Sequence, residues 1–180
     1  MNSYGANNSS LVYLDSLNGD VLAYVGSADY NNEEIDGKVD MVQQTRQPGS
    51  SIKPLIYAYG FMNLPLTIDT PIFDIPFTIG NDNPNNNDGG YEGLMPLRKA
   101  LGHSRNIPAI KMYFAAGGQD KIIPYLNDLG IASYDSKKDY GYPLAIGAGE
   151  LKMMELANAY TQLSSVNGAP AKINPIMEVK

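Results

Sequence analysis

The spacing of apolar residues changes at about Ser50, and this change restricts the fold more than any other feature of the sequence. Residues Ser10–Ser16 alternate between apolar and polar side chains, as a half-buried strand does, and Val21–Val25 form a second short apolar run. Asn18-Gly19 between them is a signal for a two-residue hairpin turn, because both central positions of that turn need a positive φ. From Ser50 onward the apolar residues recur at helical spacing. The chain is therefore predicted to be α/β, with an antiparallel hairpin packed on a helical region.

The helical region is predicted to contain five helices. The first, Ser50–Phe61, begins at a serine cap, and it tolerates Pro54 because N–H groups in a first turn lack intrahelical partners. Residues 27–49 and 64–94 are predicted to be long loops, since they are rich in turn-forming residues and show no helical period. The four further helices are expected at residues 95–102, 106–116, 119–129 and 150–163. Asn167-Gly168 is expected to end the last of these helices.

Length, charge and composition exclude several classes of function. At 180 residues the chain fits one domain, and a net charge of −6 with scattered basic residues argues against a nucleic-acid partner. No apolar run is long enough to span a membrane, and residues 1–10 lack the basic start and apolar middle of a signal peptide. There is no cysteine and one histidine, His103. Cysteine chemistry and disulfides are therefore excluded, and Ser-His-Asp catalysis or a His-rich metal cluster has a single candidate residue.

A serine and a lysine three residues apart stand at the start of the first predicted helix. Residues i and i+3 share a helix face, so the amine of Lys53 is expected to reach the hydroxyl of Ser50. A desolvated lysine loses its proton more readily and can act as general base in place of histidine, while a helix N-terminus favours a developing oxyanion. The spacing alone is weak, because Ser-x-x-Lys occurs by chance in a chain of this length. The alternative interpretation is a helix-capping serine followed by a solvated lysine.

A second candidate element is Ser104-Arg105-Asn106, which lies between two predicted helices. Ser-x-Asn is a common triplet, and two other copies lie at the hairpin turn and at a helix end, where such residues are ordinary. Ser104 differs by its setting, because it follows one helix and opens the next, with Pro108 near the first position of that helix. Such a loop can present a hydroxyl and an amide to one pocket.

Five segments of the chain, in order, resemble the transpeptidase domain of class A penicillin-binding proteins. Residues 46–54 (RQPGSSIKP) closely resemble the active-serine segment of that family, and residues 103–109 (HSRNIPA) resemble its second motif. Residues 19–26 resemble the family's second strand, and residues 84–93 resemble the stretch that leads into the second motif. Residues 147–150 and 155–160 resemble the helix that closes the region. The resemblance extends from about Leu11 to Gly168.

The resemblance implies the penicillin-binding protein/β-lactamase-like transpeptidase fold, here with an incomplete antiparallel sheet. The chain is expected to be one partial transpeptidase domain over residues 1–180. Its hairpin would span about residues 10–26, and its helical region, with the active-serine helix, about residues 50–165.

A serine acyl-enzyme mechanism also follows from the resemblance. Ser50 would attack the carbonyl between the last two D-alanines of a peptidoglycan stem peptide, and Lys53 would take its proton. Ser104 would relay that proton toward the leaving amine, and Asn106 would hold Lys53 and the substrate amide. An amine of a neighbouring stem would then accept the acyl group, and β-lactams would acylate the same serine; no metal or cofactor is implied. The expected substrate-binding residues are Gly49, Ser51, Ser104 and Asn106.

One part of the family pattern is missing. The family combines Ser-x-x-Lys and Ser-Asx-Asn with Lys-Thr-Gly, and neither that triplet nor a Lys-Ser-Gly or His-Thr-Gly substitute occurs in the chain. In the family the triplet lies on a strand beyond the point where this chain stops. The chain is therefore expected to be an internal fragment of a longer protein with a membrane anchor and a glycosyltransferase domain, acting at the outer face of the bacterial cytoplasmic membrane.

The sequence leaves two alternative functions open. One is a module that binds stem peptides without catalysis, which the missing triplet favours and the intact Ser50 and Lys53 oppose. The other is a D,D-carboxypeptidase or β-lactamase-like hydrolase, which shares the first two motifs.

Several other residues are given structural roles. His103 is predicted to end a helix, since Lys53 fills the role of base, and the spacing around Asp88 predicts a Gly-rich turn and not an EF-hand loop. Four tyrosines on apolar faces are predicted to belong to the core: Tyr57, Tyr59, Tyr113 and Tyr160.

Overall fold

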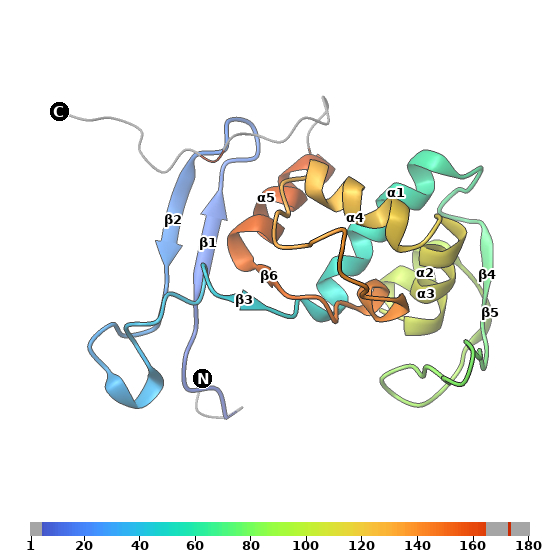
Figure 1. Ribbon diagram of the computed structural model, residues 1–180, viewed down its shortest axis with the longest axis horizontal. Coiled ribbons are helices and arrows are strands. Elements are labelled where there is room, and N and C mark those ends of the chain that lie inside the picture. Colours follow the sequence, from blue (N-terminus) through green and yellow to red (C-terminus); the bar gives the residue numbers. More distant parts are fainter. Residues whose placement is uncertain (1–4, 165–172, 174–180) are drawn as a thin grey trace. The chain divides into compact units, whose positions relative to one another are not determined.

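The computed structural model describes residues 5–164 and residue 173 (Figure 1). These residues form two compact units, each made of more than one stretch of chain. The first unit takes its residues from 1–47, 126–134 and 150–180, and the second from 48–125 and 135–149. The single domain expected over residues 1–180 stays a prediction. Within the described residues, no helix has both the length and the apolar character needed to cross a membrane.

The first unit contains the predicted hairpin. β1 (Leu11–Leu14) pairs antiparallel with β2 (Val21–Val25), with Leu11 opposite Val25. α5 (Met153–Ser164) packs against β1. An amphipathic helix therefore covers part of a hairpin whose apolar and polar residues alternate, as predicted.

The turn of this hairpin differs from the prediction. β1 ends at Leu14, and the connection is closed by Asp15, whose carbonyl accepts the N–H of Gly19 at 2.9 Å and whose carboxylate accepts the N–H of Leu17 at 2.8 Å. Gly19 has a φ of 79°, whereas Asn18 is not among the described residues with positive φ. The predicted two-residue turn is therefore wrong. The Asp15 side chain supports a longer turn, in which one left-handed residue is sufficient.

The rest of the first unit is mostly loop, as predicted for residues 27–49. The loop contains a short 3-10 helix, η2 (Glu33–Ile35), and the two-residue strand β3 (Thr45–Arg46), which pairs antiparallel with β6 (Leu151–Lys152). Because residues 151–152 take part in this pairing, α5 begins at Met153 and not at the predicted residue 150. The predicted helix end at Asn167-Gly168 lies outside the described residues.

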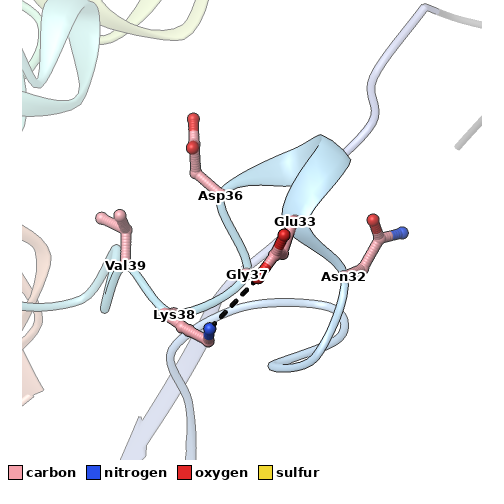
Figure 2. A pocket seen from close by; sticks show the side chains of 6 residues that line it. All are labelled: Asn32, Glu33, Asp36, Gly37, Lys38 and Val39. Atoms are coloured by element: carbon pink, nitrogen blue, oxygen red, sulfur yellow. Dashed lines mark hydrogen bonds and ion pairs between the residues drawn. The ribbon is translucent and has the colours of Figure 1, made fainter.

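A pocket lies within the loop of the first unit, and Figure 2 shows the side chains around it. The amine of Lys38 lies 3.3 Å from a carboxylate oxygen of Glu33, and both side chains are exposed. Gly37 is buried where the loop closes on itself, since a Cβ there would lie 2.0 Å from the carbonyl oxygen of Asp29. The pocket therefore combines tight loop packing with a solvated ion pair. The lining residues are Asn32, Glu33, Asp36, Gly37, Lys38 and Val39.

The second unit is built mainly of helices. A 3-10 turn, η3 (Gly49–Ile52), leads directly into α1 (Lys53–Asn63). Ser50 lies within that turn, so the predicted N-cap position of Ser50 is wrong. The N–H of Lys53 donates to the carbonyl of Ser50, three residues earlier, which is the hydrogen bond of a 3-10 turn. Pro54 lies in the first turn of α1, as predicted. The remaining helices are α2 (Leu97–Gly102), α3 (Asn106–Ala115), α4 (Gln119–Asp128), whose last residues belong to the first unit, and η4 (Tyr142–Ile146).

The second unit also contains a strand pair that the sequence patterns do not predict. β4 (Pro71–Asp74) pairs antiparallel with β5 (Gly93–Pro96), and Asp74 lies opposite Gly93. The predicted loop over residues 64–94 is therefore wrong in part. Because residues 95–96 belong to β5, α2 begins at Leu97 and not at residue 95.

The core of the second unit lies where α1 and α3 pack together. Gly60 permits their close approach, since a Cβ at that position would lie 2.3 Å from the sulfur of Met112. Tyr57 and Tyr113 are buried in agreement with the prediction, whereas Tyr59 and Tyr160 are half-buried. Among the fully buried side chains of the second unit are Ile52, Leu55, Ile56, Leu97, Ile107 and Ile110.

Candidate active site

Ser50 is held by a close contact between two glycines. Gly49 and Gly147 have φ values of 56° and 83°, which L residues with a Cβ rarely adopt. A Cβ on Gly147 would lie 2.1 Å from the carbonyl oxygen of Gly49, and the N–H of Gly49 donates to the carbonyl of Gly147 at 3.4 Å. The end of η4 therefore rests against the backbone immediately before Ser50, which is half-buried.

Ser51, a predicted substrate-binding residue, is exposed. Its hydroxyl donates to the carbonyl of Pro48 at 2.6 Å, within the same 3-10 turn. Its contact is thus with the main chain of the turn that carries Ser50. The predicted substrate-binding residues Gly49 and Ser51 consequently flank Ser50 on either side.

Lys53 is a buried amine at the first position of α1. Its side chain is 1% exposed, and the amine donates to the carbonyl of Ser104 at 2.6 Å, to the hydroxyl of Ser104 at 3.2 Å and to Oδ1 of Asn106 at 2.7 Å. Burial lowers the pKa of Lys53 from 10.5 to about 8, and the positive charge of Arg105 acts in the same direction. The amine is therefore held by three acceptors and is much easier to deprotonate than an exposed lysine.

Ser104 adopts a left-handed backbone conformation, with a φ of 54°. This conformation costs energy in a residue with a Cβ, and here both the carbonyl and the hydroxyl of the same residue contact Lys53. His103, just before it, ends α2 as predicted. His103 contacts Glu92 at 2.9 Å, and hydrogen bonds with His103 and Lys99 lower the pKa of Glu92 to about 2.

Asn106 begins α3 and turns its side-chain oxygen toward Lys53. Its Nδ2 donates to the carbonyl of Asn85 at 2.9 Å and to Oδ1 of Asn87 at 3.3 Å. Because Nδ2 faces two acceptors, Oδ1 is left to accept from the amine. Asn85 and Asn87, which entered the sequence-based prediction only as part of a resemblance, thus determine how this amide is oriented.

Arg105 is a buried residue of the site for which no role was predicted from the sequence. It is 6% exposed, and its guanidinium lies 2.7 Å from Asp74, which is fully buried, and 2.8 Å from Asp88. It also donates to the carbonyl of Gly90. Position 105 is the middle of a Ser-x-Asn triplet, and no local pattern there indicates a buried cation. Asp88 serves as an ion-pair partner at the predicted Gly-rich turn.

The structure brings three of the four predicted catalytic residues together through side-chain hydrogen bonds: Lys53, Ser104 and Asn106. Ser50 is joined to Lys53 through the main chain, since its carbonyl accepts the N–H of that residue. Within residues 5–164 and 173, no group of three or more His, Cys, Asp and Glu side chains could hold a metal ion. The arrangement places a readily deprotonated amine three residues after a serine hydroxyl, which suits nucleophilic chemistry.

Comparison with known proteins places the chain in a family. Residues 9–166 match the family described as "Penicillin binding protein transpeptidase domain". Penicillin-binding protein 1A of Neisseria meningitidis is 32% identical over 160 residues, covering 84% of this chain and 19% of the relative. Penicillin-binding protein 1C of Escherichia coli is 29% identical over 153 residues, covering 84% of this chain and 20% of the relative. The chain thus spans about a fifth of the length of these curated relatives.

Solved structures show the same fold. The crystal structure of penicillin-binding protein 1A from Haemophilus influenzae matches with a TM-score of 0.74 and 35% identity, over 86% of this chain and 23% of that chain. PonA1 from Mycobacterium tuberculosis matches with the same TM-score of 0.74 at 22% identity, over 88% of this chain and 42% of that chain. The predicted resemblance to class A penicillin-binding proteins and the predicted fold class are confirmed. The chain belongs to the penicillin-binding protein transpeptidase domain family.

Proposed function

We propose that this chain carries the nucleophile of a D,D-transpeptidase, which cross-links peptidoglycan stem peptides through an acyl-enzyme on Ser50. One observation carries the proposal: the buried amine of Lys53, held by Ser104 and Asn106, lies three residues after Ser50. Burial lowers the pKa of this amine to about 8, so a useful fraction is neutral near physiological pH and can accept a proton.

The first half of the reaction forms the acyl-enzyme. Ser50 Oγ attacks the carbonyl carbon between the last two D-alanines and gives its proton to the neutral amine of Lys53. The bond to the terminal D-alanine then breaks, and its nitrogen receives a proton from Lys53 by way of the hydroxyl of Ser104, which is 3.2 Å from that amine. Free D-alanine leaves, and the rest of the stem stays bound to Ser50 as an ester.

The second half transfers the acyl group. An amine of a neighbouring stem attacks the ester carbonyl and loses a proton to the site, and the bond to Ser50 breaks with return of a proton to its oxygen. The product is a new amide that joins two stems. Asn106 holds Lys53 throughout, and its amide, with Gly49, Ser51 and Ser104, is assigned to substrate binding.

The proposed substrate also determines partners and location. β-Lactams would acylate Ser50 in the same way, because their strained amide resembles the D-Ala-D-Ala bond. The relatives named above are penicillin-binding proteins, which supports this assignment. Peptidoglycan stems lie outside the cytoplasmic membrane, so the site would act there, within a longer membrane-anchored protein that also carries a glycosyltransferase domain.

The proposal is tested by the intact mass of the chain after incubation with benzylpenicillin. We expect a mass increase equal to one whole benzylpenicillin molecule, and we expect peptide mapping to place it on Ser50. The Ser50→Ala variant should show no adduct. Ser136→Ala is the matched control, because Ser136 is an exposed serine of the same unit, and this variant should be labelled like the parent chain.

Three results would contradict the proposal. An adduct on the Ser50→Ala variant would mean that another residue is the nucleophile. Absence of an adduct from a folded chain would favour a module that binds stem peptides without catalysis. Rapid release of the adduct as hydrolysed penicillin would favour a hydrolase of the β-lactamase type.

A further inference from the structure

Asn86 has a buried side-chain amide that contacts the backbone of the predicted catalytic residue Asn106. It is 5% exposed, and its Oδ1 accepts the backbone N–H groups of Asn106 at 2.7 Å and Ile107 at 3.3 Å. Its Nδ2 donates to Oδ1 of Asp74 at 2.8 Å and to the carbonyl of Gly90 at 2.9 Å. An amide side chain offers two donors and one oxygen that accepts twice, so every hydrogen-bonding capacity of Asn86 is used.

These contacts provide a helix cap from a distant part of the chain. The first N–H groups of a helix have no intrahelical partners, and α3 has no side-chain cap from its own N-cap residue, Arg105. Asn86 supplies the missing acceptor, although it precedes Asn106 by 20 residues. Removal of this oxygen would leave two buried N–H groups unpaired, so the start of α3 would have to shift or admit water.

Asn86 is itself held by charged groups. Asp74, on β4, accepts from Asn86 with Oδ1 and from Arg105 with Oδ2, the latter at 2.7 Å. Arg105 also pairs with Asp88 at 2.8 Å. The positive charge of Arg105 contributes to the lowered pKa of Lys53. Asp74 of β4 and the carbonyl of Gly90, in the loop between β4 and β5, therefore anchor the Nδ2 of Asn86.

The path from Asn86 to the amine of Lys53 is short. Asn86 fixes the backbone of Asn106, whose Oδ1 is one of the three acceptors of that amine. The other two acceptors belong to Ser104, two residues earlier in the same turn. A displacement of the first residue of α3 would therefore change the contacts of Lys53.

We propose that Asn86 is a positioning residue, which fixes Asn106 and through it Lys53 for the acylation of Ser50. Asn86 itself touches neither Lys53 nor Ser50 among the contacts that the structure describes. This inference rests on the function proposed above for its catalytic part, and its geometric part concerns Lys53 alone. The two parts are therefore tested separately.

The geometric part is tested by NMR titration of Lys53 in chain labelled with ¹³C-lysine, with the signal assigned by its loss in Lys53→Met. In Asn86→Ala we expect the pKa of Lys53 to fall by roughly one unit, because the charged amine loses an acceptor while it remains buried. Asn81→Ala is the matched control, since Asn81 is an exposed residue of the same loop, and it should titrate like the parent chain. Asn86→Ser serves in the same way if the alanine variant does not fold.

The catalytic part is tested by a double-mutant cycle on the rate of acylation by benzylpenicillin. Asn86→Ala should slow acylation on the order of a hundredfold. Added to Asn106→Ala, the same change should slow it by less than about tenfold, because one of the acceptors that Asn86 positions is already absent.

Each outcome decides one part. An unchanged pKa of Lys53 in a less stable Asn86→Ala variant would show a merely structural role and overturn the proposal. A pKa that rises toward its ordinary value would also overturn it, because Asn86 would then act by excluding water. Multiplying effects in the cycle would mean that Asn86 does not act through Asn106. If the parent chain is never acylated, the proposed function fails, and the titration still decides the positioning role.

Discussion

The side-chain oxygen of Asn106 lies 2.7 Å from the amine of Lys53, although 53 residues separate the two in sequence. They meet because Lys53 begins α1 and Asn106 begins α3, and these two helices pack together in the core. The helices approach closely at Gly60, where a Cβ would meet Met112. The geometry of the candidate site is thus set by helix packing, and changes far from Ser50 can alter it.

The first prediction concerns the pH dependence of acylation. Because Lys53 accepts a proton only when neutral, and burial lowers its pKa to about 8, the rate of acylation of Ser50 by benzylpenicillin should rise with pH and level off above about pH 8. Lys53→Arg should lose nearly all activity and this pH dependence, since a guanidinium stays protonated. Rates measured by intact mass against pH test this, and a rate that levels off only near pH 10.5 would show that the site does not lower the pKa of Lys53.

The same pKa predicts how stability depends on pH. Between about pH 8 and 10.5 the unfolded chain keeps a proton on Lys53 that the folded chain has lost, so the free energy of unfolding should rise with pH across this window. Below about pH 8 both states carry the proton and the contribution is constant. Urea unfolding of the parent chain and of Lys53→Met should therefore give a difference that grows in favour of the parent chain above about pH 8. A difference that does not vary with pH would contradict the burial of a charged amine.

A third prediction compares two arginines that differ in burial. Arg105 is 6% exposed and pairs with the fully buried Asp74, so Arg105→Met should lower the free energy of unfolding by about 3–5 kcal/mol. Arg98 pairs with Asp69 at 2.6 Å, but both side chains are more than half exposed, and Arg98→Met should cost less than about 1 kcal/mol. Denaturant unfolding of both variants measures the contrast. Equal losses would mean that burial of the Arg105 pair does not matter.

Local patterns in the sequence predicted the elements whose residues alternate or repeat along the chain. The hairpin of β1 and β2 and the positions of α3 and α4 follow from such patterns, and a resemblance alone supplied the expectation that Asn106 would hold Lys53. The strands β4 and β5 were missed because no short hairpin turn joins them; Asp74 pairs with Gly93 across a long, irregular loop.

The missed residues of the site depend on that strand pair. Arg105 reaches Asp74 across 31 residues, and Asn86 reaches the same carboxylate across 12. Neither contact lies within one helix or one tight turn, so periodicity and spacing carry no trace of it. A sequence predicts neighbours along an element much better than it predicts which loop will cap a distant helix.

A fourth prediction concerns a hydroxyl in the core. Tyr57 is 1% exposed, its hydroxyl has no hydrogen-bond partner among the described residues, and burial raises its pKa. Tyr57→Phe should therefore raise the free energy of unfolding by about 1–3 kcal/mol, because it removes a buried and unsatisfied polar group. Tyr113 is 2% exposed and its hydroxyl interacts with the backbone of Gln119, so Tyr113→Phe should be neutral or destabilising. A destabilised Tyr57→Phe variant would reveal an acceptor for that hydroxyl.

The last prediction separates backbone strain from contact at the serine turn. Gly147 and Gly118 have φ values of 83° and 65°, so alanine at either position should cost about 1–2 kcal/mol of strain. A Cβ at Gly147 would also lie 2.1 Å from the carbonyl oxygen of Gly49, whereas at Gly118 the nearest atom would be a ring carbon of Tyr113 at 3.8 Å. Gly147→Ala must therefore push the backbone next to Ser50, and acylation by benzylpenicillin should slow on the order of a hundredfold. Gly118→Ala should lower the thermal midpoint and leave the acylation rate nearly unchanged. Equal acylation rates in the two variants would show that the contact between the glycines does not position Ser50.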